Sequence, residues 1–198
     1  MLNDRSSPIA LLRTRRSSRP RDLVAPGPNA AELRRIVEIA ARTPDHGKLH
    51  PWHFVHVPAD GRAALADLLH RAYRIDNPAP GRLEVEAIDR FAHQAPELIV
   101  ALFRPVAPSK IPVWEQQLSC GAAVMNLLHA AHALGFAGGW VTGWAAYSDA
   151  VRDAFGGPDE RIAGFLFLGT AGCVPEERPR PDLADVFAAW RPDPGISG

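Results

Sequence analysis

The sequence predicts an α+β fold, in which helices and strands occur together without a regular alternation. Stretches with one apolar helical face occur beside short runs rich in aromatic and β-branched residues. Their order lacks the strict strand–helix–strand rhythm of a doubly wound parallel sheet. The chain also lacks G-x-G-x-x-G and G-x-x-x-x-G-K-[ST], the usual signatures of a Rossmann dinucleotide site and a nucleoside triphosphate site.

Length and composition predict one domain that spans residues 1–198. The chain has no internal repeat and no low-complexity linker, and 46% of its residues are hydrophobic. The 22 basic residues balance the 22 acidic residues, so the overall charge gives no attraction to nucleic acid or to anionic membranes. Only Cys120 and Cys173 are present, which implies no disulfide framework, and the first residues lack the apolar core of a signal peptide. We therefore expect a soluble, cytoplasmic protein without nucleic-acid or membrane partners.

The first elements are a short helix over residues 8–15 and a turn-rich connector over residues 19–28. Asn29 and Glu32 then have the spacing of a capping box at the start of a helix. The apolar face of that helix consists of Leu33, Ile36, Val37 and Ala40. Pro44 is expected to end it, because the residue before a proline disfavours helical backbone angles.

The middle of the chain alternates between strands and helices. Residues 52–57 read as a strand, and Asp60 is expected to cap a helix that runs to about residue 72. A loop over 77–81, a helix over 83–93 and a buried strand over 98–103 follow.

The last part contains the longest helical pattern, over residues 114–134, with Gly135 as its C-terminal cap. Because this helix is apolar around most of its circumference, it must be buried, in part against a second subunit. A strand or turn over 138–143, a small helix over 148–155 and a strand over 162–168 complete the pattern. The proline-rich tail carries an apolar patch at Val186, Phe187 and Trp190.

The connector RTPDHGKLHPW, residues 42–52, carries many polar donors between two prolines. Asp45 and His46 are adjacent, but adjacency alone does not make an acid–base pair. His53 and His56 would point to opposite faces of a strand, so we expect no shared metal ion. We assign no catalytic side chain and no metal ligand.

Two further segments are candidates for ligand contacts. Two guanidinium groups followed by hydroxyls in Arg15-Arg16-Ser17-Ser18-Arg19 could bind a phosphate and a polyol chain, or the segment could be a solvated basic stretch. Trp140-Val141-Thr142-Gly143 offers an aromatic ring, a hydroxyl and backbone amides that could line a planar ligand. Taken alone, the second segment is better explained as a core strand that ends in a tight turn.

Four motifs in order give the chain its resemblance to a known family. These are TRRSSR, RTPDHGKLHPWHF, WEQQLSCGAAVMNLLHAAHALGFAGGWVTG and GFLFLGT, which together extend from about residue 11 to residue 170. The sequence resembles the nitroreductase family, and most closely its short bacterial branch of NAD(P)H nitroreductases with fewer than 200 residues.

The resemblance implies helices flanking a mixed central sheet, and an interlocked homodimer. It implies FMN at the subunit interface, touched by both chains. NADH or NADPH would donate a hydride through FMN to nitroaromatic, quinone or related acceptors in a ping-pong cycle. The cofactor would carry the redox chemistry, and the protein would supply orientation and electrostatics.

The resemblance also carries over particular residues. Arg15, Arg16 and Ser17 match contacts to the phosphate and the ribityl chain, and Arg19 matches a basic residue near the pyrimidine end of the flavin. A positive charge there would stabilise the negatively charged reduced form. Contacts made across the dimer match Arg42 and His46, and the segment along the isoalloxazine ring matches Trp140, Val141 and Thr142. A segment assigned in relatives to the pyridine nucleotide matches residues 130–135.

The chain departs from the family pattern in two places. Val141 stands where close relatives can carry a basic residue, and only Arg178 and Arg180 could match basic residues that larger members place on the phosphate. Two other functions remain open. The protein could be a flavin-binding store or sensor with little turnover, or an enzyme with a narrower dehydrogenase or enone reductase task.

Overall fold

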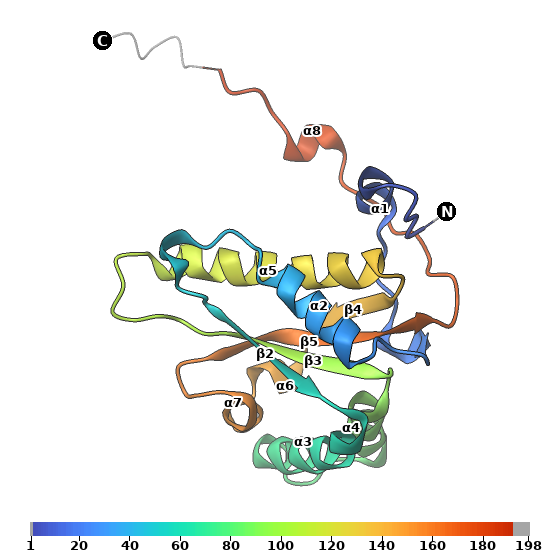
Figure 1. Ribbon diagram of the computed structural model, residues 1–198. Coiled ribbons are helices and arrows are strands. Elements are labelled where there is room, and N and C mark those ends of the chain that lie inside the picture. The colour runs from blue at the N-terminus through green and yellow to red at the C-terminus, as the bar shows by residue number, and fades with distance from the viewer. Residues whose placement is uncertain (1, 192–198) are drawn as a thin grey trace.

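The computed structural model describes residues 2–191 and forms helices on both faces of one sheet (Figure 1). The helices are α1 (Pro8–Thr14), α2 (Ala30–Ala40), α3 (Arg62–Asp76), α4 (Arg82–His93), α5 (Val113–Ala133), α6 (Trp144–Tyr147), α7 (Asp149–Phe155) and α8 (Leu183–Val186). The strands are β1 (Leu23–Val24), β2 (Trp52–Val57), β3 (Glu97–Phe103), β4 (Ala137–Val141) and β5 (Arg161–Ala171). The 3-10 turns are η1 (Pro20–Asp22), η2 (His46–Lys48) and η3 (Ala59–Gly61).

β5 is the centre of the sheet. Phe165 and Leu168 of β5 are paired with residues of both β3 and β4, so these two strands lie on opposite sides of β5. β2 pairs with the outer side of β3, and β1 pairs with the C-terminal end of β5. The predicted α+β class is confirmed, but the predicted mixed sheet is wrong for residues 2–191. Every strand pair in this part of the chain is antiparallel.

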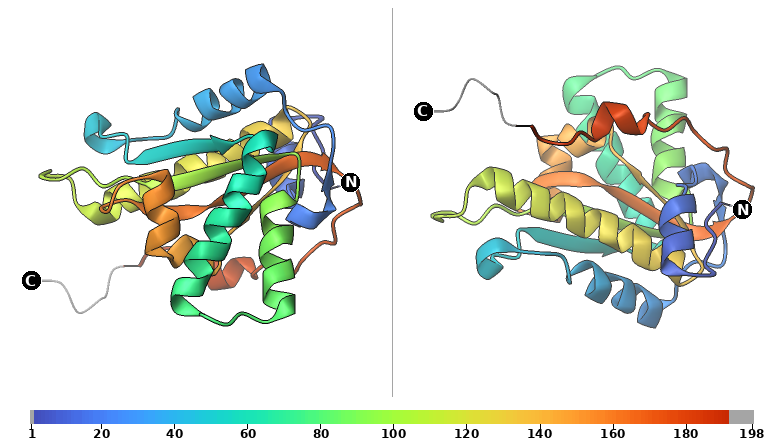
Figure 2. Two further views of the ribbon diagram at one scale, coloured as in Figure 1. Left: turned by 90° about the horizontal axis from the view of Figure 1, so that it is seen from below. Right: turned by 90° about the horizontal axis from the view of Figure 1, so that it is seen from above.

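The alternation of side chains along the strands divides the interior into two cores. Leu98 and Val100 of β3 face one core, whereas Ile99 and Ala101 face the other. Helices α3, α4, α6 and α7 cover the first core, and α2 and α5 cover the second (Figures 1 and 2). β3 is therefore buried on both faces, which explains its uninterrupted apolar sequence.

The helix starts show how far local sequence determines the elements. Asn29 accepts hydrogen bonds from the backbone N–H of Ala31 and Glu32, and Glu32 accepts one from Asn29 N at 2.8 Å, so the predicted capping box is confirmed. The prediction that Asp60 caps α3 is wrong. The η3 turn moves the helix start to Arg62, and no side chain from residues 2–191 caps it.

We expect Asn29→Ala to lower the free energy of unfolding by about 1 kcal/mol, because two N–H groups of the first turn lose their acceptor. Chemical denaturation followed by circular dichroism measures this change. Asn77→Ala cannot serve as a matched control for this substitution, because Asn77 follows α3 and itself donates a hydrogen bond to Glu84. An unchanged midpoint for Asn29→Ala would show that the box contributes nothing.

Within residues 2–191, no helix combines the length and the apolar character that crossing a membrane requires.

Candidate functional site

The segment from Arg15 to Arg19, called the arginine segment below, runs beside β4. α1 ends at Thr14, and the chain continues in extended form until Pro20 begins η1. Ser18 N donates a hydrogen bond to Gly138 O at 3.0 Å, which attaches the segment to the outer side of β4. A Cβ atom at Gly139 would lie 2.5 Å from Ser18 O, so only glycine permits this close approach. The first and third sequence motifs are therefore neighbours in space.

Arg15 is a half-buried cation without an acidic partner in the described part of the chain. Its guanidinium donates to Ser17 Oγ at 3.2 Å, and no carboxylate of residues 2–191 pairs with it. Arg180 Nη2 donates to Arg15 O at 3.5 Å, which brings a second guanidinium to this segment. Burial lowers the pKa of Arg15, and the charges of Arg180 and Arg16 lower it further. Positive charges that repel one another in this way favour binding of an anion.

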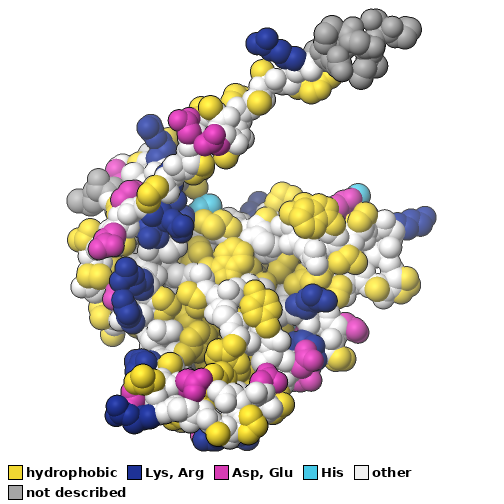
Figure 3. All heavy atoms as spheres, turned by 180° about the vertical axis from the view of Figure 1, so that it is seen from behind, with side chains coloured by type: hydrophobic (Ala, Val, Ile, Leu, Met, Phe, Trp, Pro, Cys, Tyr) yellow, Lys and Arg dark blue, Asp and Glu magenta, His cyan; other side chains and the backbone are white. Residues whose placement is uncertain are grey.

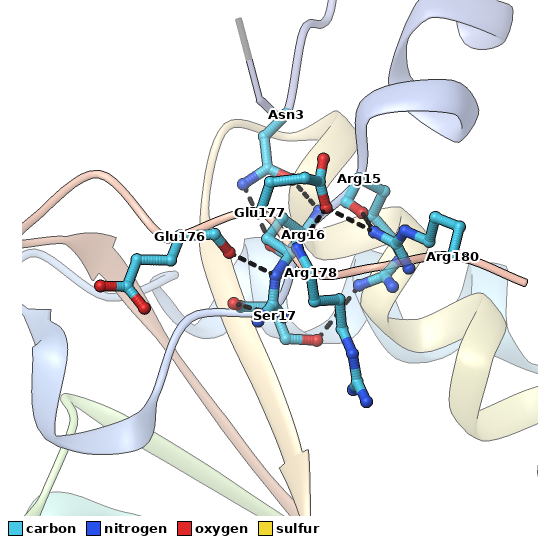
Figure 4. A network of polar contacts seen from close by, with 8 residues as sticks. All are labelled: Asn3, Arg15, Arg16, Ser17, Glu176, Glu177, Arg178 and Arg180. Carbon is cyan, nitrogen blue, oxygen red and sulfur yellow. Dashed lines mark hydrogen bonds and ion pairs between the residues drawn. The ribbon is translucent and has the colours of Figure 1, made fainter.

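Arg16 is turned toward the C-terminal segment, residues 173–191 (Figure 4). Its Nε donates to Glu176 O at 2.7 Å, and its Nη1 donates to Ser17 O at 3.3 Å. The Asn3 side chain binds both backbone groups of Arg16, at 2.7 Å and 3.1 Å. The side chain and the backbone of Arg16 are thus both engaged within the protein, so Arg16 joins the N-terminal turn, the arginine segment and the C-terminal segment.

A hollow of about 120 Å³ lies where the arginine segment meets residues 173–176. Arg19 faces it and makes a loose ion pair of 3.8 Å with Glu176. Both side chains are exposed, so this pair adds little stability and can be displaced. Ser18 Oγ is buried at the hollow without a hydrogen-bond partner within residues 2–191. An unused hydroxyl beside the exposed guanidinium of Arg19 suits a polar anionic ligand.

β4 presents a free edge next to the arginine segment. In an antiparallel strand the N–H and C=O of one residue point to the same edge, and the edge alternates along the chain. Gly138 turns its C=O outward to Ser18, so Trp140 turns both peptide groups outward too, and Thr142 continues the series. Within residues 2–191, neither backbone pairs with a strand on that side. A planar ligand with donors and acceptors could bind along this edge.

The side chains of this edge diverge. Trp140 Nε1 donates to Ala163 O at 3.0 Å, and the indole covers Gly164, where a Cβ atom would lie 2.1 Å from Nε1. Val141 points to the opposite face and packs against the core under α3 and α4. Val141 therefore has a packing role, at the position where the family resemblance allows a basic residue. Thr142 lies exposed just beyond the strand.

Arg42 and His46 do not join this group within one chain. They belong to the loop that follows α2, which is fastened to the first half of α5. Ser119 Oγ donates to Pro44 O at 2.7 Å, and His46 Nδ1 lies 2.7 Å from Glu115 Oε2. The Arg15 charge acts on His129, which lies ten residues beyond Ser119 along α5, and ten residues of helix span about 15 Å. The loop that carries Arg42 and His46 is therefore distant from Arg15 within one chain.

Residues 130–135 form the last turn of α5 and the two residues that follow it, and the charge of Arg15 acts on His132 in this stretch. His132 is buried and donates from Nδ1 to Leu128 O at 2.7 Å, and burial lowers its pKa. Ala130 and Ala131 are also buried, so only Ala133 and Gly135 of this stretch are exposed.

Sequence reasoning missed several residues at the site. Asn3 and Glu176 fix Arg16, and Glu177 accepts from Arg180 Nη2 at 3.1 Å. The signal for Glu177 was the run E-E-R-P-R, in which acidic residues directly precede the two arginines. Asn3 carries no such signal, because its role depends on a contact 13 residues away.

Comparisons with known proteins identify sequence relatives of this chain and structures with the same fold. The sequence model described as the Nitroreductase family matches residues 12–170. A protein from Haemophilus influenzae, named provisionally as an NAD(P)H nitroreductase, is 38% identical over 165 residues, which cover 82% of this chain and 87% of that protein.

Two solved structures share the fold. A nitroreductase-like family protein from Bacillus cereus superposes with a TM-score of 0.79 at 19% identity, covering 94% of this chain and 97% of that one. An FMN- and NADPH-dependent nitroreductase from Sphigopyxis sp. strain HMH superposes with a TM-score of 0.71 at 20% identity, covering 94% and 99%. From the match over residues 12–170 and the 38% identity to the Haemophilus influenzae protein, we conclude that this chain belongs to the nitroreductase family.

Proposed function

We propose that the protein is an FMN-dependent oxidoreductase that takes electrons from NADH or NADPH and passes them to nitroaromatic, quinone or related acceptors. Family membership, the name of the Haemophilus influenzae relative and the cofactors named for the Sphigopyxis structure support this proposal. The observation that carries it is the half-buried Arg15, which has no acidic partner within residues 2–191 and belongs to the segment that Ser18 attaches to the outer side of β4. That combination suits a flat ligand with a phosphate at one end.

In this proposal Arg15 and Ser17 bind the FMN phosphate, with the Arg180 guanidinium close by. The outward peptide groups of Trp140 and Thr142 bind the polar edge of the ring system. Arg19 places a positive charge near the pyrimidine end, after its loose pairing with Glu176 is displaced. Bound FMN supplies the hydride chemistry, and these residues supply position and electrostatic stabilisation.

We further propose an interlocked homodimer. The C-terminal segment leaves the body of the molecule (Figure 1), and its large apolar side chains are exposed. These side chains are Leu183, Val186, Phe187 and Trp190, with exposures of 68%, 65%, 71% and 86%. Hydrophobic side chains also gather in a hollowed face flanked by lysine and arginine side chains (Figure 3). Such exposed apolar surface is typical of an interface, and the loop carrying Arg42 and His46 would reach the partner's FMN there.

Replacing Phe187 and Trp190 together by Asp should convert the dimer to monomer, because two charges cannot be buried in an apolar interface. Analytical ultracentrifugation measures the change. The matched control replaces Ile75 and Leu83, each 69% exposed on α3 and α4, in the same way, and should stay dimeric. A dimer that survives the first pair would contradict the role given to the C-terminal segment.

The visible spectrum of the purified protein tests the proposed activity. FMN-loaded protein should be yellow, lose its colour with NADH or NADPH in the absence of oxygen, and regain it on addition of a nitroaromatic. Colour that neither nucleotide bleaches would favour a flavin store or sensor instead. Protein that takes up no FMN would contradict both functions.

A further inference from the structure

A second hollow of about 280 Å³ opens beside the proposed flavin site. It lies between helices α3 and α4 on one side and the turn after β4 on the other. Thr142 and Gly143 of that turn line it, so the hollow begins where the free edge of β4 ends.

Rigid apolar side chains form most of its wall. Tyr73 and Trp144 meet edge to face, with ring centroids 4.8 Å apart and an interplanar angle of 64°. Phe91 is fixed from behind by Phe165 and Phe167, at 5.1 Å and 5.3 Å. Aromatic pairs in this arrangement hold their positions, so the hollow is preformed.

Glu84 is the one charged residue among the described residues that line the hollow. Its Oε1 accepts from Tyr73 Oη at 2.6 Å and from Asn77 Nδ2 at 3.1 Å, and its Oε2 accepts from Gly81 N at 2.7 Å. The hydrogen bond from Tyr73 lowers the pKa of Glu84, and the bond from Gly81 N lowers it further. A fixed negative charge therefore stands at an otherwise apolar wall.

We propose that this hollow binds an apolar ring or ring substituent of the electron acceptor and discriminates against acceptors that carry a negative charge. The inference rests on the proposed function, since Thr142 connects the hollow to the proposed ring site. Its volume suits one ring with small substituents, and its aromatic walls suit a flat one. The Glu84 carboxylate repels an anion and tolerates a neutral or cationic group.

Filling the hollow tests the binding claim. Ala87 is exposed on α4 and lines the hollow, so Ala87→Phe should occupy it without disturbing the core. The second-order rate constant for re-oxidation by 4-nitrobenzyl alcohol should fall at least about tenfold, as expected for loss of a ring contact. Re-oxidation by ferricyanide, an inorganic acceptor that needs no apolar slot, should stay within about twofold. Ala63→Phe, on the exposed surface of α3, is the matched control and should leave both rates unchanged.

Removing the charge tests the discrimination. Wild-type protein should prefer 4-nitrobenzyl alcohol over 4-nitrobenzoate by about tenfold, and Glu84→Gln should reduce the preference to about twofold. Ferricyanide reduction by Ala87→Phe and by Glu84→Gln shows that FMN and the nucleotide still function in each variant.

If ferricyanide is reduced normally but Ala87→Phe and Glu84→Gln both match the wild type with organic acceptors, the acceptor hollow is refuted and the proposed function stands. If the wild type binds no FMN, the proposed function itself fails.

Discussion

Arg15→Gln should weaken FMN binding by about 10- to 150-fold, which corresponds to the loss of one charge-assisted hydrogen bond to phosphate. The reason lies in the surroundings of Arg15. Among the described residues 2–191, its half-buried guanidinium donates only to Ser17 Oγ, and the neighbouring Arg16 and Arg180 leave the segment with excess positive charge. Titration of flavin-free protein with FMN, followed by quenching of flavin fluorescence, measures the dissociation constant.

Two controls isolate the phosphate contribution. Arg13→Gln removes an equal charge from the exposed surface of α1 and should change the dissociation constant by less than about twofold. Riboflavin lacks the phosphate, so Arg15→Gln should leave its affinity unchanged. Equal losses for FMN and riboflavin would show that Arg15 supports the fold and does not bind the phosphate.

Arg62→Met should lower the free energy of unfolding by about 3–5 kcal/mol. Arg62 begins α3 and is only 4% exposed, yet burial lowers its pKa without removing its charge. Its guanidinium donates to Val57 O and Ala92 O at 3.1 Å and 3.0 Å, and to Gln94 O and Pro96 O at 3.4 Å each. One side chain thus connects the end of β2 with the segment between α4 and β3. Methionine fills similar space but leaves these carbonyl groups without a donor.

Arg71→Met on the exposed face of the same helix is the matched control and should change stability by less than about 0.5 kcal/mol. Urea unfolding followed by tryptophan fluorescence gives both values. Arg62→Lys should recover part of the loss, because an ammonium group reaches fewer of the carbonyl groups. A wild-type midpoint for Arg62→Met would contradict the role assigned to this side chain.

The sequence predicted elements whose signals are local. The strand over residues 52–57, the capping box at Asn29 and Glu32, and the long helix that Gly135 ends all follow from propensity and spacing. β1 and α6 were missed, because elements of two and four residues form only through contacts made by the rest of the fold. The antiparallel sheet was mispredicted for the same reason, since strand direction depends on long-range pairing.

At the site, the sequence indicated the segments but not which of their residues are engaged by contacts within the protein and which are available to a ligand. The motif TRRSSR treats Arg15 and Arg16 alike, whereas the structure leaves Arg15 available and engages Arg16 with Asn3 and Glu176. The motif WVTG likewise presents three neighbouring residues, but strand alternation turns Trp140 and Val141 to opposite faces. Arg42 and His46 are distant from Arg15 within one chain, so their predicted contact with FMN depends on the proposed dimer.

A crystal structure of the protein with FMN is the most direct test of the central claim. The phosphate should lie within hydrogen-bonding distance of the Arg15 guanidinium, and the ring should follow the edge of β4 at Trp140 and Thr142. FMN bound elsewhere, or no FMN bound at a saturating concentration, would contradict the account.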